Sequence, residues 1–167
     1  FSSRPDRRKP IVVAEGHRCD ASGRLRLDRL RELSDPADFS CLLTEPGPWL
    51  GAFDLPFGLP RELMAHWGWC APQASAAGGD PPWSELMARF GALDRADMVE
   101  RMRTFCAARP VGGKFAHRRT DGPAGSSPSM KWVNPPVAQM MHAGAPRLLR
   151  AGVHLPGLGV AGDRRRV

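Results

Sequence analysis

The stretch Trp49-Leu-Gly-Ala-Phe-Asp-Leu-Pro-Phe-Gly-Leu-Pro60 decides the fold that we predict from the sequence. Its first five residues are a near-continuous apolar run, which is typical of a strand that is covered on both faces. Pro56 and the residues beyond it cannot continue a sheet. We therefore predict a central parallel strand over residues 49–53 that ends at Asp54.

Two further strand patterns precede this run. Residues 11–14 are apolar and largely β-branched, and residues 24–29 alternate between polar and apolar types, which predicts a half-buried strand. The link over residues 16–23 is rich in turn-forming residues. An antiparallel hairpin is the economical pairing for the two segments.

Helix signals follow in several places. Ser34-Asp-Pro36 offers an N-cap and an early proline, Asp94 can cap the strongest helix, and Asn134 precedes a proline before the last one, which we expect to stop near Gly144. Residues 71–82 form a Pro-, Gly- and Ala-rich loop. The predicted helices cover a short stretch through Phe39 and Leu43, then residues 61–67, 83–93, 94–108 and 134–144.

Length and composition favour one protein domain. A chain of 167 residues is long enough to bury a single core. It has no apolar run of membrane-spanning length, and the basic residues near its N-terminus precede no signal-peptide core. We therefore predict a soluble cytoplasmic domain over residues 1–167, with a helical and loop insertion over residues 71–130 and no membrane association. The sequence predicts no protein partner and leaves the oligomeric state open.

Basic residues are concentrated in the loops. The formal net charge is +7, and basic residues gather at residues 1–10 and 109–131, whereas residues 35–108 are acidic overall. Such loops suit a polyanion. Arginine-rich coding bias and ordinary solvated loop charge explain the same composition, so both readings stay open at this point.

Several familiar chemistries have no anchor in the chain. The segment that ends at Gly113-Lys114 lacks the other residues of a phosphate-binding Walker loop. Neither the glycine pattern of dinucleotide-binding folds nor the motifs of zinc peptidases and α/β-hydrolases occurs. The four cysteines lie far apart, which argues against a zinc ribbon.

Asp54 is the best candidate for chemistry. Ligands of open α/β sheets bind beyond the carboxyl ends of strands, and a carboxylate there suits Mg²⁺ or Mn²⁺. Paired metal ions activate water for phosphodiester cleavage, so Asp54 is predicted as a metal ligand and catalytic residue that needs further acidic partners. The alternative is that Asp54 is a turn residue or a helix-preceding cap before Pro56.

A second constellation lies in the long irregular segment between the last two predicted helices. Its cations suit phosphate oxygens, while Phe115 and Trp132 offer faces on which a base could stack. His117 and Asp121 could orient each other as catalytic groups, or Asp121 could pair with Arg118 and fix the loop. The predicted substrate-binding residues are Lys114, Arg118, Arg119, Lys131 and Asn134.

Three segments together resemble the bacterial domain of unknown function 429 family. They are Phe1-Ser-Ser-Arg-Pro5, Gly51-Ala-Phe-Asp-Leu-Pro-Phe-Gly-Leu-Pro60 and the long run from Gly112 to Pro136. The resemblance implies a ribonuclease H-like α/β fold, with a mixed sheet flanked by helices and acidic residues at the strand ends. By the resemblance, Asp54 follows the fourth strand and lies beside the first.

The same resemblance implies that both ends of the chain are cut. Similar proteins carry an Asp just before the Phe-Ser-Ser segment and continue past the Arg-rich end into another strand with an acid. We predict a metal-dependent nuclease or phosphodiesterase that acts on nucleic acid or a nucleotide. The alternatives are a non-catalytic nucleic-acid-binding module and an inactive truncated product.

Overall fold

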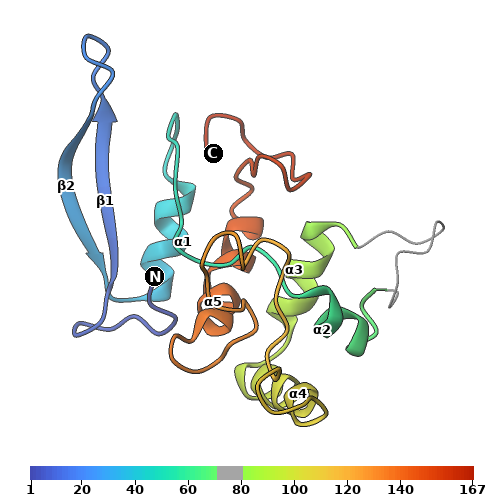
Figure 1. The fold of residues 1–167 in the computed structure, drawn as a ribbon. Helices are drawn as coiled ribbons and strands as arrows, with labels where there is room; N and C mark the ends of the chain where they lie inside the picture. The colour runs from blue at the N-terminus through green and yellow to red at the C-terminus, as the bar shows by residue number, and fades with distance from the viewer. Residues whose placement is uncertain (71–80) are drawn as a thin grey trace.

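A β-hairpin and five helices make up the part of the chain that the structure describes, which is residues 1–70 and 81–167 of a computed structural model. The strands are β1 (Ile11–Arg18) and β2 (Leu25–Leu33), paired in antiparallel fashion (Figure 1). The arrangement is therefore mixed α/β. The helices are α1 (Pro36–Thr44), α2 (Arg61–His66), α3 (Trp83–Ala92), α4 (Arg95–Ala107) and α5 (Val137–Arg150).

The hairpin confirms the antiparallel pairing predicted from its turn-rich link. Residue Gly23 adopts a φ of 67° in the connecting turn, a conformation that suits a residue without a Cβ. The base of the hairpin reaches the core, through the buried Ile11 and Leu33 and the partly buried Val13. The prediction that residues 24–29 are half-buried is wrong, because the strand projects beyond the helices that would cover it.

The predicted central strand over residues 49–53 is absent from the described sheet. Trp49 forms one isolated parallel bridge, with Arg166, and Leu50 is 83% exposed. Helix α1 contacts both β2 and α5. Figure 1 shows α1 between the hairpin and the chain segment that follows α1. A strand needs a neighbouring strand to satisfy its backbone groups. Here the backbone N–H groups of Trp49 and Gly51 donate to the irregular C-terminal segment, at Arg165 and Val167.

Local capping explains where two helices begin. The side chain of Asp35 accepts a hydrogen bond from the backbone N–H of Ala37 at the start of α1, with Pro36 in the first turn. The side chain of Asp94 accepts one from Asp97 at the start of α4. Helices α2 and α3 have no side-chain cap, and all four helices α1 to α4 lie at the predicted positions.

Helix α5 differs from its prediction at both ends. It begins after Pro136 rather than at Asn134, and no side chain caps it. It also continues through Gly144 and Pro146 to Arg150. A Cβ at Gly144 would lie 2.5 Å from Cδ2 of Leu55, so this glycine permits close packing within the helix instead of ending it.

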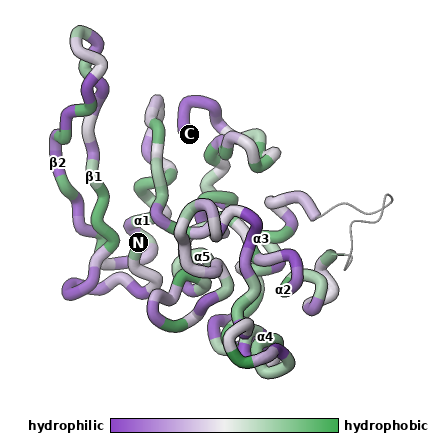
Figure 2. The backbone as a smooth tube through the Cα atoms, viewed as in Figure 1, coloured by the Kyte–Doolittle hydropathy of each residue, from purple (hydrophilic) through white to green (hydrophobic). Residues whose placement is uncertain are grey.

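One cluster of buried apolar side chains joins the helices and the base of the hairpin. Helix α5 contacts α1 and α3, and α2 contacts α4 (Figure 2). The described part of the predicted insertion, residues 81–130, contributes Met87, Met102 and Met130 to this same cluster. Residues 71–80 of the insertion lie outside the described residues.

The described structure can be compared with the predicted ribonuclease H-like fold and with the predicted absence of membrane association. The described residues form a two-stranded sheet, which is smaller than the mixed sheet of a ribonuclease H-like domain, so that finer class stays a prediction. Within the described residues, no helix combines the length and the apolar character needed to cross a membrane.

Candidate nucleic-acid interface

The basic loop, defined here as residues 109–133, joins α4 to α5. Its first turn is attached to the end of α4, because the thiol of Cys106 donates to the carbonyl oxygen of Lys114 at 3.2 Å. Burial raises the pKa of this thiol, which keeps it a neutral donor. The Nε of Arg109 donates to the carbonyl of Gly113, and its guanidinium pairs with Glu62. Arg109 therefore holds the loop in place.

A buried carboxylate organises the middle of the loop. The Asp121 side chain is fully buried and accepts hydrogen bonds from the backbone N–H of Arg118 at 2.8 Å and from its Nε at 2.9 Å. The backbone N–H of Ser126 donates to the carbonyl of Asp121. Of the two arrangements left open by the sequence, the structure has the Arg118–Asp121 pair.

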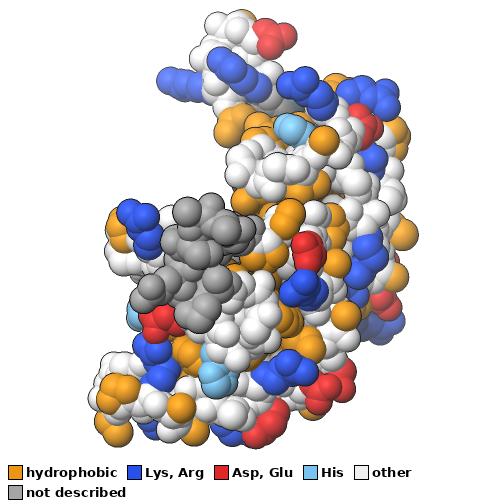
Figure 3. All heavy atoms as spheres, turned by 90° about the vertical axis from the view of Figure 1, so that its right-hand side faces the viewer, with side chains coloured by type: hydrophobic (Ala, Val, Ile, Leu, Met, Phe, Trp, Pro, Cys, Tyr) orange, Lys and Arg blue, Asp and Glu red, His pale blue; other side chains and the backbone are white. Residues whose placement is uncertain are grey.

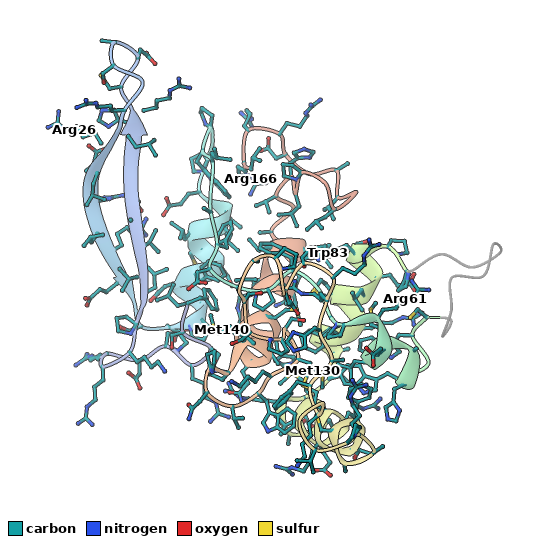
Figure 4. The ribbon with its side chains drawn as sticks, viewed as in Figure 1. Arg26, Arg61, Trp83, Met130, Met140 and Arg166 are labelled. Carbon is teal, nitrogen blue, oxygen red and sulfur yellow. The ribbon has the colours of Figure 1, made fainter. Side chains whose placement is uncertain are left out.

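The far end of the loop is attached to the core and to α5. Met130 is fully buried, and its sulfur lies 3.3 Å from the backbone nitrogen of Ala116 (Figure 4). The rings of Phe115 and Trp132 pack edge to face with centroids 5.3 Å apart. The carbonyl of Lys131 accepts from Ala138 in α5. The contact between the two aromatic rings thus joins the first part of the loop to its last part. It also covers some of the aromatic surface that we expected to stack on bases.

Several polar side chains of the loop remain directed to solvent. Lys114, His117 and Arg119 are exposed, and Lys131 is partly exposed. None of these four side chains forms an ion pair with any residue that the structure describes. Asn134 is also exposed just beyond the loop. The loop therefore offers cationic donors on a backbone that other residues hold fixed.

Asp54 lies apart from the setting that the sequence predicted. Its side chain is 94% exposed, it ends no strand, and its Oδ2 atom lies 3.8 Å from the α-amino nitrogen of Phe1. Among the described residues, no hydrogen bond or ion pair joins Asp54 to the basic loop. The placement at a strand end is wrong because the strand itself does not form.

The described residues do not assemble a metal site around this carboxylate. No group of three or more His, Cys, Asp or Glu side chains within residues 1–70 and 81–167 is arranged to hold a metal ion. A single carboxylate is too small a ligand set for Mg²⁺ or Mn²⁺ in a two-metal mechanism. The predicted Mg²⁺ or Mn²⁺ site does not fit the donors that are present in this part of the chain.

The structure adds cations that the sequence argument did not single out. Figure 3 shows Lys and Arg side chains gathered at the upper end of the molecule, where Figure 1 places the hairpin tip. Figure 4 shows Arg26 projecting from the hairpin. Arg166, in contrast, donates inward to the carbonyls of Leu43 and Ala151. The alternation of Arg and Leu over residues 24–27 was the available signal.

Comparison with known proteins returns no relative: no family model, no curated protein and no solved structure matches the chain. The resemblance to the domain of unknown function 429 family stays a prediction from its motifs. What the structure shows is a mixed α/β chain with an ordered basic loop. A function must therefore be proposed from the chemistry of these residues.

Proposed function

We propose that the basic loop binds the phosphate backbone of nucleic acid and that it does so without catalysis. The observation that supports this proposal is the separation of the loop's charged groups into two sets. Arg109 and Arg118 are neutralised by Glu62 and Asp121. Lys114 and Arg119 are exposed and pair with no described carboxylate.

The fixed backbone of the loop favours binding. Ordering a flexible segment on binding costs conformational entropy, whereas a loop that is already held in place avoids much of that cost. The buried pair between Arg118 and Asp121 and the packing of Met130 supply this order before any ligand arrives. Exposed Lys and Arg side chains on such a loop suit phosphate oxygens.

The same geometry favours recognition without base readout. Phe115 and Trp132 pack edge to face, so one ring covers part of the other and less aromatic surface is open to stacked bases. Contacts to phosphate carry no sequence information, and their strength falls steeply with salt. The expected ligand is therefore a nucleic acid strand or duplex of any sequence.

Fluorescence anisotropy with a labelled duplex tests this proposal. Replacing Lys114 and Arg119 together by Ala should weaken binding and should reduce the slope of log affinity against log salt by about 2, since each lost phosphate contact contributes about 0.9. The matched control replaces Arg101 and Arg164, two exposed arginines without described partners, by Ala. Equal losses in both double variants would show that only net charge matters and would defeat the proposal.

A metal-dependent nuclease is the second candidate. The observation that favours it is the accessibility of the Asp54 carboxylate, which is 94% exposed. The missing ligands would have to come from outside the described residues, so no catalytic step is assigned. Cleavage assays with Mg²⁺ or Mn²⁺ should show activity that Asp54→Ala abolishes and that Asp38→Ala, a change at another exposed aspartate, retains. Equal cleavage by wild type and Asp54→Ala would remove Asp54 from the reaction.

A further inference from the structure

The outer face of the hairpin is defined by four residue pairs of its register. These are Val12 with Glu32, Ala14 with Leu30, Gly16 with Leu27, and Arg18 with Leu25. Side chains alternate between the two faces of a strand, so alternate pairs share one face. The irregularity between Glu15 and Gly16 leaves Asp28 without a partner in the register. This bulge keeps Leu27 and Leu30 on one face, although three positions separate them.

The outer hairpin face is apolar and uncovered. Val12 is 59% exposed, Leu25 86%, Leu27 59% and Leu30 62%. The opposite face carries Ile11 and Leu33, which are buried against the core at the base of the hairpin. Figure 2 shows hydrophobic segments along both strands of this projecting hairpin. A contiguous apolar patch of this kind on a surface is typical of an interaction site.

Charges on the two faces are arranged differently. On the inner face, hydrogen bonds from Arg31 and Arg29 lower the pKa of Glu15, and Arg31 also pairs with Glu45. On the outer face, Arg18 lies near the tip and Glu32 at the base, and neither side chain forms an ion pair with a described residue. About 20 Å of strand separates these two charges.

This pattern is self-complementary. If a second copy is turned end for end, its Glu32 meets Arg18 of the first copy, and its Arg18 meets Glu32, with the apolar side chains between them. The same face packed tip to tip would oppose two arginines at one end and two glutamates at the other, which disfavours that orientation. A twofold axis through the centre of the strip satisfies both ends at once.

We propose that the outer hairpin face packs against the same face of a second copy of this chain, tip to base, to form a symmetric dimer. The outer hairpin faces of the two copies lie against each other, with the leucines of both copies removed from water and an ion pair between Arg18 and Glu32 at each end. This dimer is independent of the basic loop, so it does not rest on the proposed function.

Sedimentation velocity from low to high micromolar concentration tests the proposal, with protein freed of nucleic acid. Wild type should dimerise, and Leu27→Lys should be monomeric. Leu50→Lys, a matched change at another exposed leucine outside the hairpin, should dimerise as wild type does. A monomer throughout the range overturns the proposal, and so does a dimer that survives Leu27→Lys. Far-ultraviolet circular dichroism checks that both variants are folded.

Charge exchange tests the orientation. Arg18→Glu places two like charges at each end of the interface, and Glu32→Arg does the same with the opposite sign. Each should weaken dimerisation about tenfold or more. The double variant Arg18→Glu with Glu32→Arg restores opposite charges and should regain most of the wild-type affinity. If the double variant is as weak as the two losses combined, the tip-to-base arrangement is wrong.

Discussion

Asp121 shows how one residue decides what its neighbours can do. Its carboxylate is buried and engages Arg118 through the backbone N–H and the guanidinium. The sequence left two roles open for Asp121, a catalytic group beside His117 or a partner that fixes Arg118, and it predicted Arg118 as a phosphate-binding cation. Their pairing gives them a structural role and leaves Lys114 and Arg119 as the accessible cations.

Asp121→Asn should destabilise the protein. The substitution removes the charge that Arg118 faces in a largely buried setting, so we expect a loss of about 2 kcal/mol in the free energy of unfolding. Urea denaturation measures the loss. Asp20→Asn, at an exposed turn of the hairpin, is the control and should change stability by less than about 0.5 kcal/mol. Equal stability of the two variants would contradict a structural role for Asp121.

The carboxylate of Asp163 should make the free energy of unfolding depend on pH in acid. Hydrogen bonds from the backbone N–H and guanidinium of Arg165, and from Arg166, lower the pKa of Asp163 to about 2. Because the folded-state pKa lies below the unfolded value, this contribution is present above about pH 4 and is lost as pH falls toward about 2.

Asp163→Asn should therefore flatten the acid dependence of stability between about pH 4 and pH 2. Urea denaturation at a series of pH values measures this dependence in wild type and variant. Asp6→Asn is the control, since Asp6 accepts only from the backbone of its own exposed turn. An unchanged pH profile in Asp163→Asn would show that the folded state does not hold this carboxylate charged.

Helix α5 is the element against which α1 and α3 pack. Its buried face carries small residues, Ala138, Gly144 and Ala145, so neighbouring elements approach closely. Gly91 of α3 lies against Pro146 of α5, and a Cβ at Gly91 would stand 2.8 Å from Cβ of Pro146. The close contact between α3 and α5 depends on this missing side chain.

Gly91→Ala should lower stability, although the same change within a helix commonly stabilises by up to about 1 kcal/mol. Overpacking costs about 1 to 3 kcal/mol, so a net loss of about 1 kcal/mol is expected. Thermal and urea unfolding measure it. Gly122→Ala, where no atom lies within 4 Å of the added Cβ, is the control. A more stable Gly91→Ala protein would show that α3 and α5 are not tightly packed there.

At the scale of the whole molecule, the C-terminal segment connects distant parts of the chain. The backbone N–H of Trp49 donates to the carbonyl of Arg165, and that of Val167 donates to Trp49. The guanidinium of Arg166 reaches the carbonyls of Leu43, in the last turn of α1, and of Ala151, which directly follows α5. The contacts of Trp49 with Arg165 and of Leu43 with Arg166 join segments more than a hundred positions apart in sequence.

Arg166→Ala should weaken this connection. Two carbonyl oxygens and the carboxylate of Asp163 lose a charged donor, which we expect to cost about 2 kcal/mol. Chemical denaturation measures the loss, and hydrogen exchange at Trp49 should increase with it. Arg164→Ala, at an exposed position without a described partner, should remain within about 0.5 kcal/mol of wild type. A neutral Arg166→Ala would mean that these contacts carry little free energy.

Sequence by itself determined the local features of this protein. Alternation and a turn predicted the hairpin. The Ser34-Asp-Pro36 segment and the cap Asp94 predicted where α1 and α4 begin, because each signal operates within a few residues. The concentration of cations in the basic loop was also evident from the sequence. The resemblance to a known family and the predicted nuclease chemistry stay predictions.

Tertiary structure alone decided the features that depend on distant partners. Residues 49–53 are apolar enough for a strand, yet the described sheet supplies no neighbour for them. The sequence predicted that Gly144 ends a helix, whereas in the structure the helix continues and Leu55 packs against this glycine. Arg118 and Arg119 are alike in sequence, and only the fold buries a carboxylate beside one of them. Backbone pairing, close packing and burial join residues that are remote along the chain, so no local pattern reports them.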